Sequence, residues 1–350
     1  MLFSYKYINH SMEKMQEYID YIFFHIWCIA PDHNFEEALF DDEPDLKEIY
    51  TTLHNNDIKS ADFFIGGIKR IFYIFKDLSA DDIEQLQIWY QSNNNIECLC
   101  NNDNQINAIT YSDIAKTNLK LSETLESFFT NLYSSDFLEL KVIKDKMGSI
   151  ADHYKEFVKT NSIGKCPFCG LYDIDSEYDK TRDAYDHFFP KSKYPFSSIN
   201  FKNLSPMCYK CNSSNKGTKD PLHDAKGNKR KSFYAYCAEG HSISIKIELK
   251  SADIQNLKPE DIDISYEPNE YLEEINTWID LFGIDDRYKA KCCSIEARFW
   301  VSEIIDDCRD LSPEEYLHIR LETAQTAPYL ERNFLRIPFL RACEEKHIFA

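Results

Sequence analysis

The sequence of residues 166–217 is CPFCGLYDIDSEYDKTRDAYDHFFPKSKYPFSSINFKNLSPMCYKCNSSNKG. It contains two pairs of cysteines with two residues between the partners, Cys166 with Cys169 and Cys208 with Cys211. Each pair can place two thiolates on one ion, and four thiolates complete the tetrahedral shell of a zinc ion. Because such a shell leaves no open position, the pattern predicts a structural zinc. The alternative is four ordinary buried cysteines, but two pairs at one spacing within 46 residues rarely coincide.

Candidate catalytic residues lie between the two cysteine pairs and directly after them. Asp186 and His187 are adjacent in the 38-residue stretch between the pairs, and Asn212 follows the last cysteine. Histidine takes a proton near neutral pH, and carboxylate and amide oxygens suit a hard cation. Hydrolysis of a phosphodiester needs both functions, an activated water and a cation that absorbs charge on the leaving oxygen. On a regular strand Asp186 and His187 point to opposite faces, so both reach one phosphate only where the strand bends or bulges.

The charge of the chain is unevenly distributed. The whole chain carries −19, but residues 180–231 hold twelve Lys and Arg against four Asp, a local +8. Because phosphate binding depends on the local field, this basic segment is the predicted contact with nucleic acid. Within this segment we predict that three lysines contact the phosphate backbone, Lys191, Lys193 and Lys216. These lysines would touch the backbone and not the bases, so their contribution should be equal for all sequences. No recognition helix is visible, so the sequence does not indicate any base specificity.

Composition and length limit the class of protein. The chain has 350 residues, 43% of them hydrophobic, which is sufficient for a packed core and two or three domains. The twelve cysteines are too few for a disulfide scaffold. The first residues lack the basic and apolar regions of a signal peptide, and the longest apolar run, 18–30, is too short to cross a bilayer. We therefore expect a soluble, cytoplasmic protein with reduced thiols and no membrane partner.

Helical periodicity dominates the chain on both sides of residues 161–250. Apolar residues from Met12 to Ile26 repeat at steps of three and four, residues 63–75 are apolar on nearly all sides, and residues 111–157 are again periodic. The asparagine-rich stretch 92–107 between them is predicted to be a loop. We therefore predict a helical N-terminal domain over residues 1–160 and a helical C-terminal region over 251–350.

Residues 161–250 differ in character and are predicted to form a separate module. They contain short aromatic runs, most of the basic charge, and a strictly alternating stretch, 242–249, that predicts a strand. In the C-terminal region an apolar stripe from Leu272 ends at Gly283, and Ser312 to Glu315 form a capping box. The predicted fold class is α+β, mostly α-helical, with a zinc-bound module between helical arms.

The module resembles a known family of nucleases. Residues 166–217 look like the zinc-bound branch of the HNH, or ββα-metal, endonucleases, with an aspartate-histidine pair, a middle asparagine and a last metal-binding position in the same order. Within this module, DHFFPKSKYP and CNSSNKG are most similar to bacterial anti-phage HNH proteins, including the nuclease subunit of Septu-type systems. The resemblance covers about a seventh of the chain and leaves both helical arms unmatched.

The resemblance implies a role for each of four residues of the motif. It implies that His187 activates water, that Asp186 and Asn212 bind the catalytic metal, and that Asn203 fixes the loop carrying the histidine. Many HNH enzymes have histidine at the last position. Because Asn212 stands there in this chain, we expect Mg²⁺ or Mn²⁺ rather than a metal that prefers histidine. The implied activity is cleavage of DNA in anti-phage defence, with an ATPase subunit as a partner.

Some alternatives remain open at the level of sequence. Asn215 lies on the same predicted helical turn as Asn212 and could replace it as a metal ligand, and His223 could serve as a further ligand. A different class of function is a zinc-knuckle module that binds nucleic acid or a protein partner without cutting. The intact Asp186-His187 pair favours the nuclease, because a module that only binds does not need it.

Overall fold

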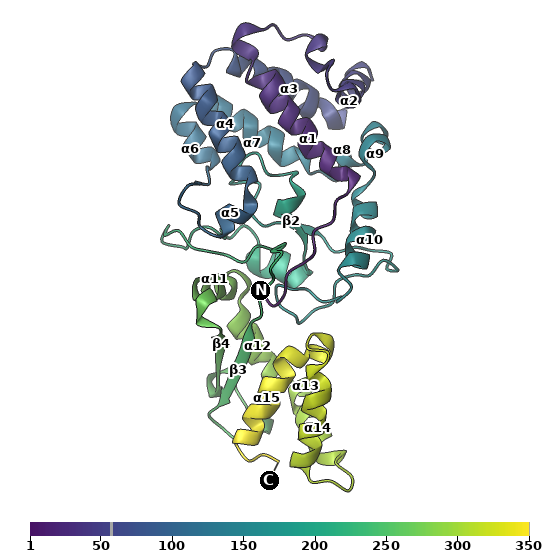
Figure 1. Cartoon of the computed structure of the whole chain (residues 1–350), viewed down its shortest axis with the longest axis vertical. Helices are drawn as coiled ribbons and strands as arrows, with labels where there is room; N and C mark the ends of the chain where they lie inside the picture. Colours follow the sequence, from purple (N-terminus) through teal and green to yellow (C-terminus); the bar gives the residue numbers. More distant parts are fainter. Residues whose placement is uncertain (57–58, 350) are drawn as a thin grey trace.

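The computed structural model describes residues 1–56 and 59–349, and Figure 1 shows its helical N-terminal region above a smaller C-terminal region. The chain is mostly helical with two small antiparallel sheets, which confirms the predicted α+β class. The N-terminal helices are α1 (Lys14–Tyr21), α2 (Pro44–Asn55), α3 (Asp62–Phe75), α4 (Ala80–Asn94), α5 (Ile96–Cys100), α6 (Tyr111–Thr117), α7 (Leu119–Leu132), α8 (Ser135–Leu138), α9 (Lys141–Met147) and α10 (Ile150–Thr160). Short 3-10 helices in this region are η1 (Ser11–Glu13), η3 (Ala30–Asp32), η4 (Glu37–Phe40) and η5 (Lys59–Ala61).

The N-terminal core forms around α3, as its nearly uniform apolar character predicts. The π-helix η2 (Ile22–Trp27) continues α1 and carries Trp27, whose Nε1 donates to the Ile68 carbonyl of α3 at 3.0 Å. On another side of α3, Gly67 faces Phe128 of α7. A Cβ at Gly67 would lie 2.7 Å from the Phe128 ring, so only glycine permits this approach of the two helices.

The central segment contains little regular structure. Strand β1 (Tyr185–His187) pairs antiparallel with β2 (Leu204–Pro206), and His187 lies opposite Leu204. The short 3-10 helix η6 (Phe201–Asn203) leads into β2, and the π-helix η7 (Lys210–Lys216) follows it. In Figure 1 this part of the chain lies between the N-terminal helices and the C-terminal region.

The C-terminal region combines a hairpin with helices. Its elements are β3 (Ser244–Leu249), β4 (Ile262–Glu267), α11 (Leu272–Phe282), α12 (Ile284–Cys292), α13 (Ile295–Asp306), α14 (Pro313–Gln325) and α15 (Asn333–Glu345), with short 3-10 helices η8 (Ile254–Asn256), η9 (Pro259–Asp261), η10 (Asn269–Tyr271) and η11 (Leu330–Arg332). Strand β3 pairs with β4 along its full length and packs against α15. The predicted strand therefore exists, but it pairs across the predicted boundary at residues 250 and 251 and packs with the C-terminal helices.

Local signals in the sequence mark several helix ends correctly. Gly283 ends α11 in the left-handed conformation with φ of 59°, and Ser312 forms the predicted capping box with Glu315. The asparagine-rich stretch was wrongly predicted to be a loop throughout, because it contains α5, whose first turn is capped by the Asn95 side chain. Across the described residues, the helices are too short or too polar to span a bilayer.

Candidate active site and metal centre

The four predicted zinc ligands form two matching turns. In the first turn the amides of Cys169 and Gly170 donate to the Cys166 carbonyl at 3.2 and 2.7 Å. In the second turn the amides of Cys211 and Asn212 donate to the Cys208 carbonyl at 2.9 and 3.0 Å. Each turn directs its two sulfur atoms to the same side.

Gly170 completes the first turn with φ of +64°, a conformation that costs glycine little. A Cβ at this position would also lie 2.5 Å from side-chain carbons of Leu2 and Phe334. These neighbours belong to the first and last parts of the chain, so segments near both ends of the sequence pack against this turn. The turn therefore requires glycine for its backbone and for the space around it.

The sulfur positions fit a zinc ion. All four cysteines are buried, and their Sγ atoms lie within 4.8 Å of one another, with Cys169 and Cys208 Sγ 3.9 Å apart. Four ligands at a Zn–S distance of about 2.3 Å would place neighbouring sulfurs about 3.8 Å apart in a tetrahedron. Bound zinc would hold the two turns together and would have no position left for a substrate.

Three residues of the C-terminal helices contact the four-cysteine cluster and could not be assigned from the sequence. Arg287 of α12 donates from Nη1 to Cys211 Sγ at 3.3 Å. Trp278 of α11 donates to the Phe168 carbonyl at 2.7 Å, and Tyr288 of α12 donates to the Cys169 carbonyl at 2.9 Å. The guanidinium places positive charge beside the thiolates. The four-cysteine cluster and the C-terminal helices therefore form one packed unit.

His187 is held in one tautomer. Its Nε2 lies 2.8 Å from the Ser198 carbonyl, which can only accept, so Nε2 carries the proton and Nδ1 has a lone pair. The Tyr133 ring packs edge-on against the imidazole with centroids 4.8 Å apart. Burial lowers the pKa of His187 to about 3, and the positive charge of Lys191 acts in the same direction. At neutral pH the residue is therefore an uncharged base, and Nδ1 has no hydrogen-bond partner among residues 1–56 and 59–349.

Asn203 ties together the two sides of the loop that follows His187. Its Oδ1 accepts from the Phe189 amide at 2.8 Å, and its Nδ2 donates to the carbonyls of Phe189 and Ser197 at 3.2 Å each. The side chain is 1% exposed. These bonds close the loop that carries Ser198, the partner of His187. Asn203 ends η6 directly before β2, and its positioning role stays a prediction.

Asp186 is buried beside a lysine on the next helix. Lys216 of η7 is fully buried, and its ammonium lies 2.9 Å from Asp186 Oδ2 and 3.0 Å from the His187 carbonyl. The contact with Oδ2 is an ion pair that lacks hydrogen-bond geometry, so this buried oxygen has no hydrogen bond within the described chain. Burial raises the pKa of Asp186, and Lys216 opposes that change.

The π-helix η7 gives Asn212 and Asn215 different surroundings. Its wide turn, closed by the Gly217 amide donating to the Asn212 carbonyl at 2.7 Å, accommodates one more residue than an α-helical turn. Asn215 donates its side-chain amide to the Lys210 carbonyl. The half-buried Asn212 side chain makes no hydrogen bond among the described residues. Asn212 is therefore the better candidate ligand of the two.

The three lysines predicted to touch phosphate are all engaged within the protein. Lys191 donates to the carbonyls of Thr130 and Tyr133 at the end of α7, and Lys193 lies 2.5 Å from the Asp220 carboxylate. The Lys216 side chain has no exposed surface, so the prediction that it contacts phosphate at the surface is wrong. The sequence predicts the amount of basic charge in this segment, but it does not predict the residues of the protein that these three lysines contact.

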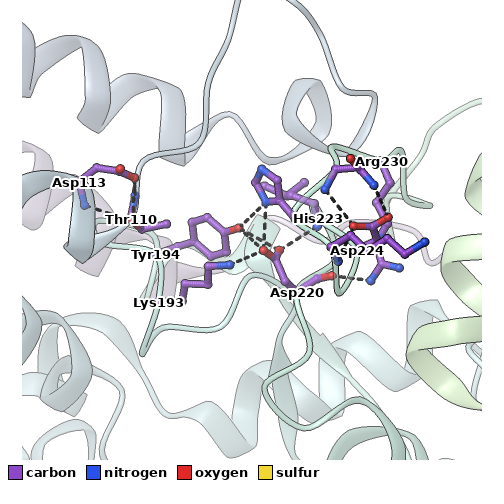
Figure 2. Close-up of polar contacts among 11 residues, drawn as sticks. Thr110, Asp113, Lys193, Tyr194, Asp220, His223, Asp224 and Arg230 are labelled. Atoms are coloured by element: carbon purple, nitrogen blue, oxygen red, sulfur yellow. Dashed lines mark hydrogen bonds and ion pairs between the residues drawn. The ribbon is translucent and has the colours of Figure 1, made fainter.

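Asp220 is the centre of the polar cluster that holds Lys193. Figure 2 shows Lys193, Tyr194 and His223 pointing toward its carboxylate. The Tyr194 hydroxyl donates to both carboxylate oxygens at 2.8 Å, and His223 Nδ1 lies 3.0 Å from Oδ2. His223, considered as a further metal ligand, therefore belongs to a contact that joins two loops of the central segment.

Comparisons with known proteins give a partial match. An alignment of 94 residues, which covers 24% of this chain, is 35% identical to the Septu protein PtuB of Bacillus thuringiensis. The match spans 34% of that protein, so the chain corresponds to about a third of the length of this curated relative. No family model matches the chain. No solved structure matches it either.

Proposed function

We propose that the chain is a metal-dependent HNH-type endonuclease that hydrolyses DNA phosphodiester bonds. The observation that carries the proposal is the pairing of a neutral, single-tautomer His187 with an adjacent buried carboxylate. Nε2 of His187 is fixed to the Ser198 carbonyl, and Asp186 Oδ2 has no hydrogen bond among the described residues. The first group has a lone pair on Nδ1 that can accept a proton, and the second is a carboxylate that a cation could share with Lys216.

In this proposal His187 Nδ1 takes a proton from the water that attacks phosphorus. The water oxygen forms a bond to phosphorus, the bond to the 3′ oxygen breaks, and solvent protonates the leaving oxygen. The products carry 5′-phosphate and 3′-hydroxyl ends. Bound Mg²⁺ or Mn²⁺, held by Asp186 and Asn212, would absorb negative charge on the leaving oxygen. The hydrogen bond to Ser198 and the Asn203 contacts keep the imidazole oriented throughout.

The biological setting that we propose is anti-phage defence, with an ATPase subunit as a partner. The partial match to a Septu protein supports this setting. The acidic N-terminal and C-terminal helices have no assigned role in hydrolysis, so we assign them to contacts with other proteins.

A second candidate function is a zinc-stabilised module that binds nucleic acid or protein without cutting. One contact favours it: Lys216 neutralises Asp186 in a position where a catalytic cation would be needed. A protein of this class would hold zinc and would show no metal-dependent cleavage.

Plasmid cleavage with added Mg²⁺ or Mn²⁺ separates the two candidates. The wild-type chain, alone or with its partner, should nick or linearise plasmid, and His187→Ala and Asp186→Ala should not. Zinc content measured on the same preparations should be equal in all three proteins, because neither residue touches the thiolates. Equal cleavage by wild type and both variants would contradict the assigned residues, and no cleavage by any of them with full zinc would favour the binding module.

A further inference from the structure

A pocket of about 600 Å³ lies between the end of α4, the start of α5, η6 and residues 234–236. Its volume falls within the range of about 300–1,000 Å³ typical of small-molecule sites. Neither Asp186 nor His187 lines it, so it has no part in the proposed hydrolysis. The asparagine-rich stretch after α4, which the nuclease does not explain, supplies part of its wall.

Rigid aromatic rings line the interior of this pocket. Tyr90 stacks on Phe23 with ring centroids 4.1 Å apart, and its hydroxyl donates to Asp20 Oδ1 at 2.5 Å. Tyr236 donates its hydroxyl to the Leu204 carbonyl of β2. Because Tyr90 and Tyr236 are only 2% and 8% exposed, they form the floor of the pocket. The half-buried rings of Tyr7 and Phe24, which also line the pocket, supply the aromatic surface that a ligand can reach.

Three exposed polar side chains surround the pocket. Gln91, Glu97 and Lys202 make no side-chain hydrogen bond or ion pair with any part of the chain in 1–56 and 59–349. Together they offer an amide, a carboxylate that can only accept, and a single positive charge. The neighbouring Asn94 differs, because its amide already donates to Tyr90 and accepts from Asn200.

We infer that this pocket binds a nucleotide. A nucleobase has the planar face that stacks on tyrosine, and its edge carries the donors and acceptors that Gln91 and Glu97 complement. Because a carboxylate accepts only, Glu97 favours a base whose edge presents N–H groups side by side, as guanine does. Lys202 supplies the charge for one phosphate. This site is separate from the proposed hydrolytic site and does not depend on it.

The pocket lies next to the candidate active site along the chain. Lys202 precedes Leu204 by two residues, and Leu204 is opposite His187 in the β1–β2 pair. The nucleotide can therefore be a free molecule that contacts the η6–β2 junction, or an unstacked residue of a nucleic-acid strand. Both sources share one chemistry and are distinguished by experiment.

Calorimetric titration of the full chain with guanosine monophosphate, without added Mg²⁺ or Mn²⁺, tests the inference. We expect saturable binding, weaker binding of guanosine, which lacks the phosphate, and weaker binding of ribose 5-phosphate, which lacks the base. Lys202→Gln should weaken binding by about fivefold, as expected for an exposed ion pair of about 1 kcal/mol. Glu97→Ala should weaken it similarly, and the exposed Lys226→Gln is the matched control. All three positions are on the surface, so the fold should persist.

A single-stranded oligonucleotide with a fluorescent purine analogue tests the other source. Stacking on tyrosine should quench its fluorescence, and Lys202→Gln and Glu97→Ala should reduce the quenching. Binding of the oligonucleotide alone assigns the pocket to a strand, and binding of the monophosphate assigns it to a free nucleotide. The inference is overturned if neither probe binds in the millimolar range, or if Lys226→Gln weakens binding as much as the pocket variants. Because no hydrolysis is measured, either result leaves the nuclease proposal intact.

Discussion

The buried ammonium of Lys216 governs the electrostatics of the candidate active site. It lies 2.9 Å from Asp186 Oδ2 and donates to the His187 carbonyl. A buried carboxylate needs a counter-charge, and in this chain a lysine four residues after Asn212 provides one. A cation bound by Asp186 and Asn212 must share that carboxylate with Lys216.

Lys216→Met should therefore destabilise the metal-free protein, because it leaves the carboxylate buried without a partner. Breaking such a pair costs about 3–5 kcal/mol of the unfolding free energy. Added Mn²⁺ should raise the thermal midpoint more in Lys216→Met than in wild type, since the cation then supplies the missing charge. Lys210→Met, exposed on the same helix, is the control. If Mn²⁺ raised the thermal midpoint equally in Lys216→Met and in wild type, Lys216 and the cation would not share Asp186.

His153 gives a pH dependence of stability at the residue scale. It is 2% exposed on α10, its Nδ1 lies 2.5 Å from the Tyr185 hydroxyl, and burial lowers its pKa to about 3. The unfolded chain has a histidine pKa of about 6.5, so the unfolded state binds more protons between these values. The stability that His153 contributes is thus present above about pH 6.5 and is lost as pH falls toward the folded pKa.

His153→Gln should accordingly lose less stability on acidification than wild type. From about pH 7.5 to about pH 5 the difference should be about 2 kcal/mol of unfolding free energy, by linkage. Denaturant unfolding at the two pH values measures it, with the exposed His25→Gln as control. Equal pH dependence in His153→Gln and wild type would mean that His153 is not held neutral.

At the scale of elements, the C-terminal helices contact the four-cysteine cluster that could hold zinc. Arg287 of α12 contacts Cys211 Sγ, and Tyr288 of the same helix bonds the Cys169 carbonyl. Four thiolates around Zn²⁺ carry two net negative charges, and the guanidinium offsets part of that charge at close range.

Arg287→Met should speed the release of zinc to a chelator. Elemental analysis should give close to one zinc per chain in wild type, and a colorimetric chelator should withdraw it faster from the variant. Arg298→Met is the control, because that guanidinium contacts the Gln255 carbonyl instead. Zinc release at the wild-type rate would contradict the electrostatic role, and a folded preparation without zinc would contradict the zinc site itself.

The elements that the sequence predicts well are those determined by local chemistry. The apolar α3, the cap at Ser312 and the glycine end of α11 each depend on residues within one or two turns. The buried position of Lys216 and the contact of Arg287 depend on packing between segments far apart in the chain, which no local pattern encodes. The same reason explains α5, where Asn95 caps a short helix inside a stretch with loop composition.

The candidate site divides in the same way. The spacing of the four cysteines predicts the sulfur cluster, because each pair forms a short local turn and the cluster requires only that the two turns lie side by side. The residues Asp186, His187, Asn203 and Asn212 follow from the family resemblance, and their assigned roles stay predictions. The Ser198 carbonyl that fixes the tautomer of His187 left no signal in the sequence, because any residue can supply a backbone carbonyl.

At the scale of the whole molecule, the proposed contact of this acidic protein with DNA would have to use a small basic area. The net charge of −19 includes a segment of +8, but Lys191, Lys193 and Lys216 are engaged internally. The basic side chains of this segment that remain exposed without an ion pair in the described structure include Lys180, Arg182 and Lys210. These are the revised candidates for contact with the phosphate backbone.

Replacing Lys180, Arg182 and Lys210 together by glutamine should reduce the slope of log affinity against log salt by about 2–3. Affinity should fall equally for DNA of different sequences, because these contacts are to the backbone. Replacement of Lys69, Arg70 and Lys120 in the N-terminal helices removes the same charge and should leave the slope nearly unchanged. A similar loss in this control would place the path of DNA across the helical region.

The most direct test of the nuclease account is single-turnover cleavage by His187→Gly with and without imidazole in the buffer. The variant should lose about 10²–10⁴-fold in rate, the usual contribution of a general base, and should keep its zinc. Imidazole should restore part of the rate in proportion to the concentration of its neutral form, because it can occupy the space of the missing ring and accept the proton. Cleavage by His187→Gly at the wild-type rate, with chemistry limiting, would contradict the account.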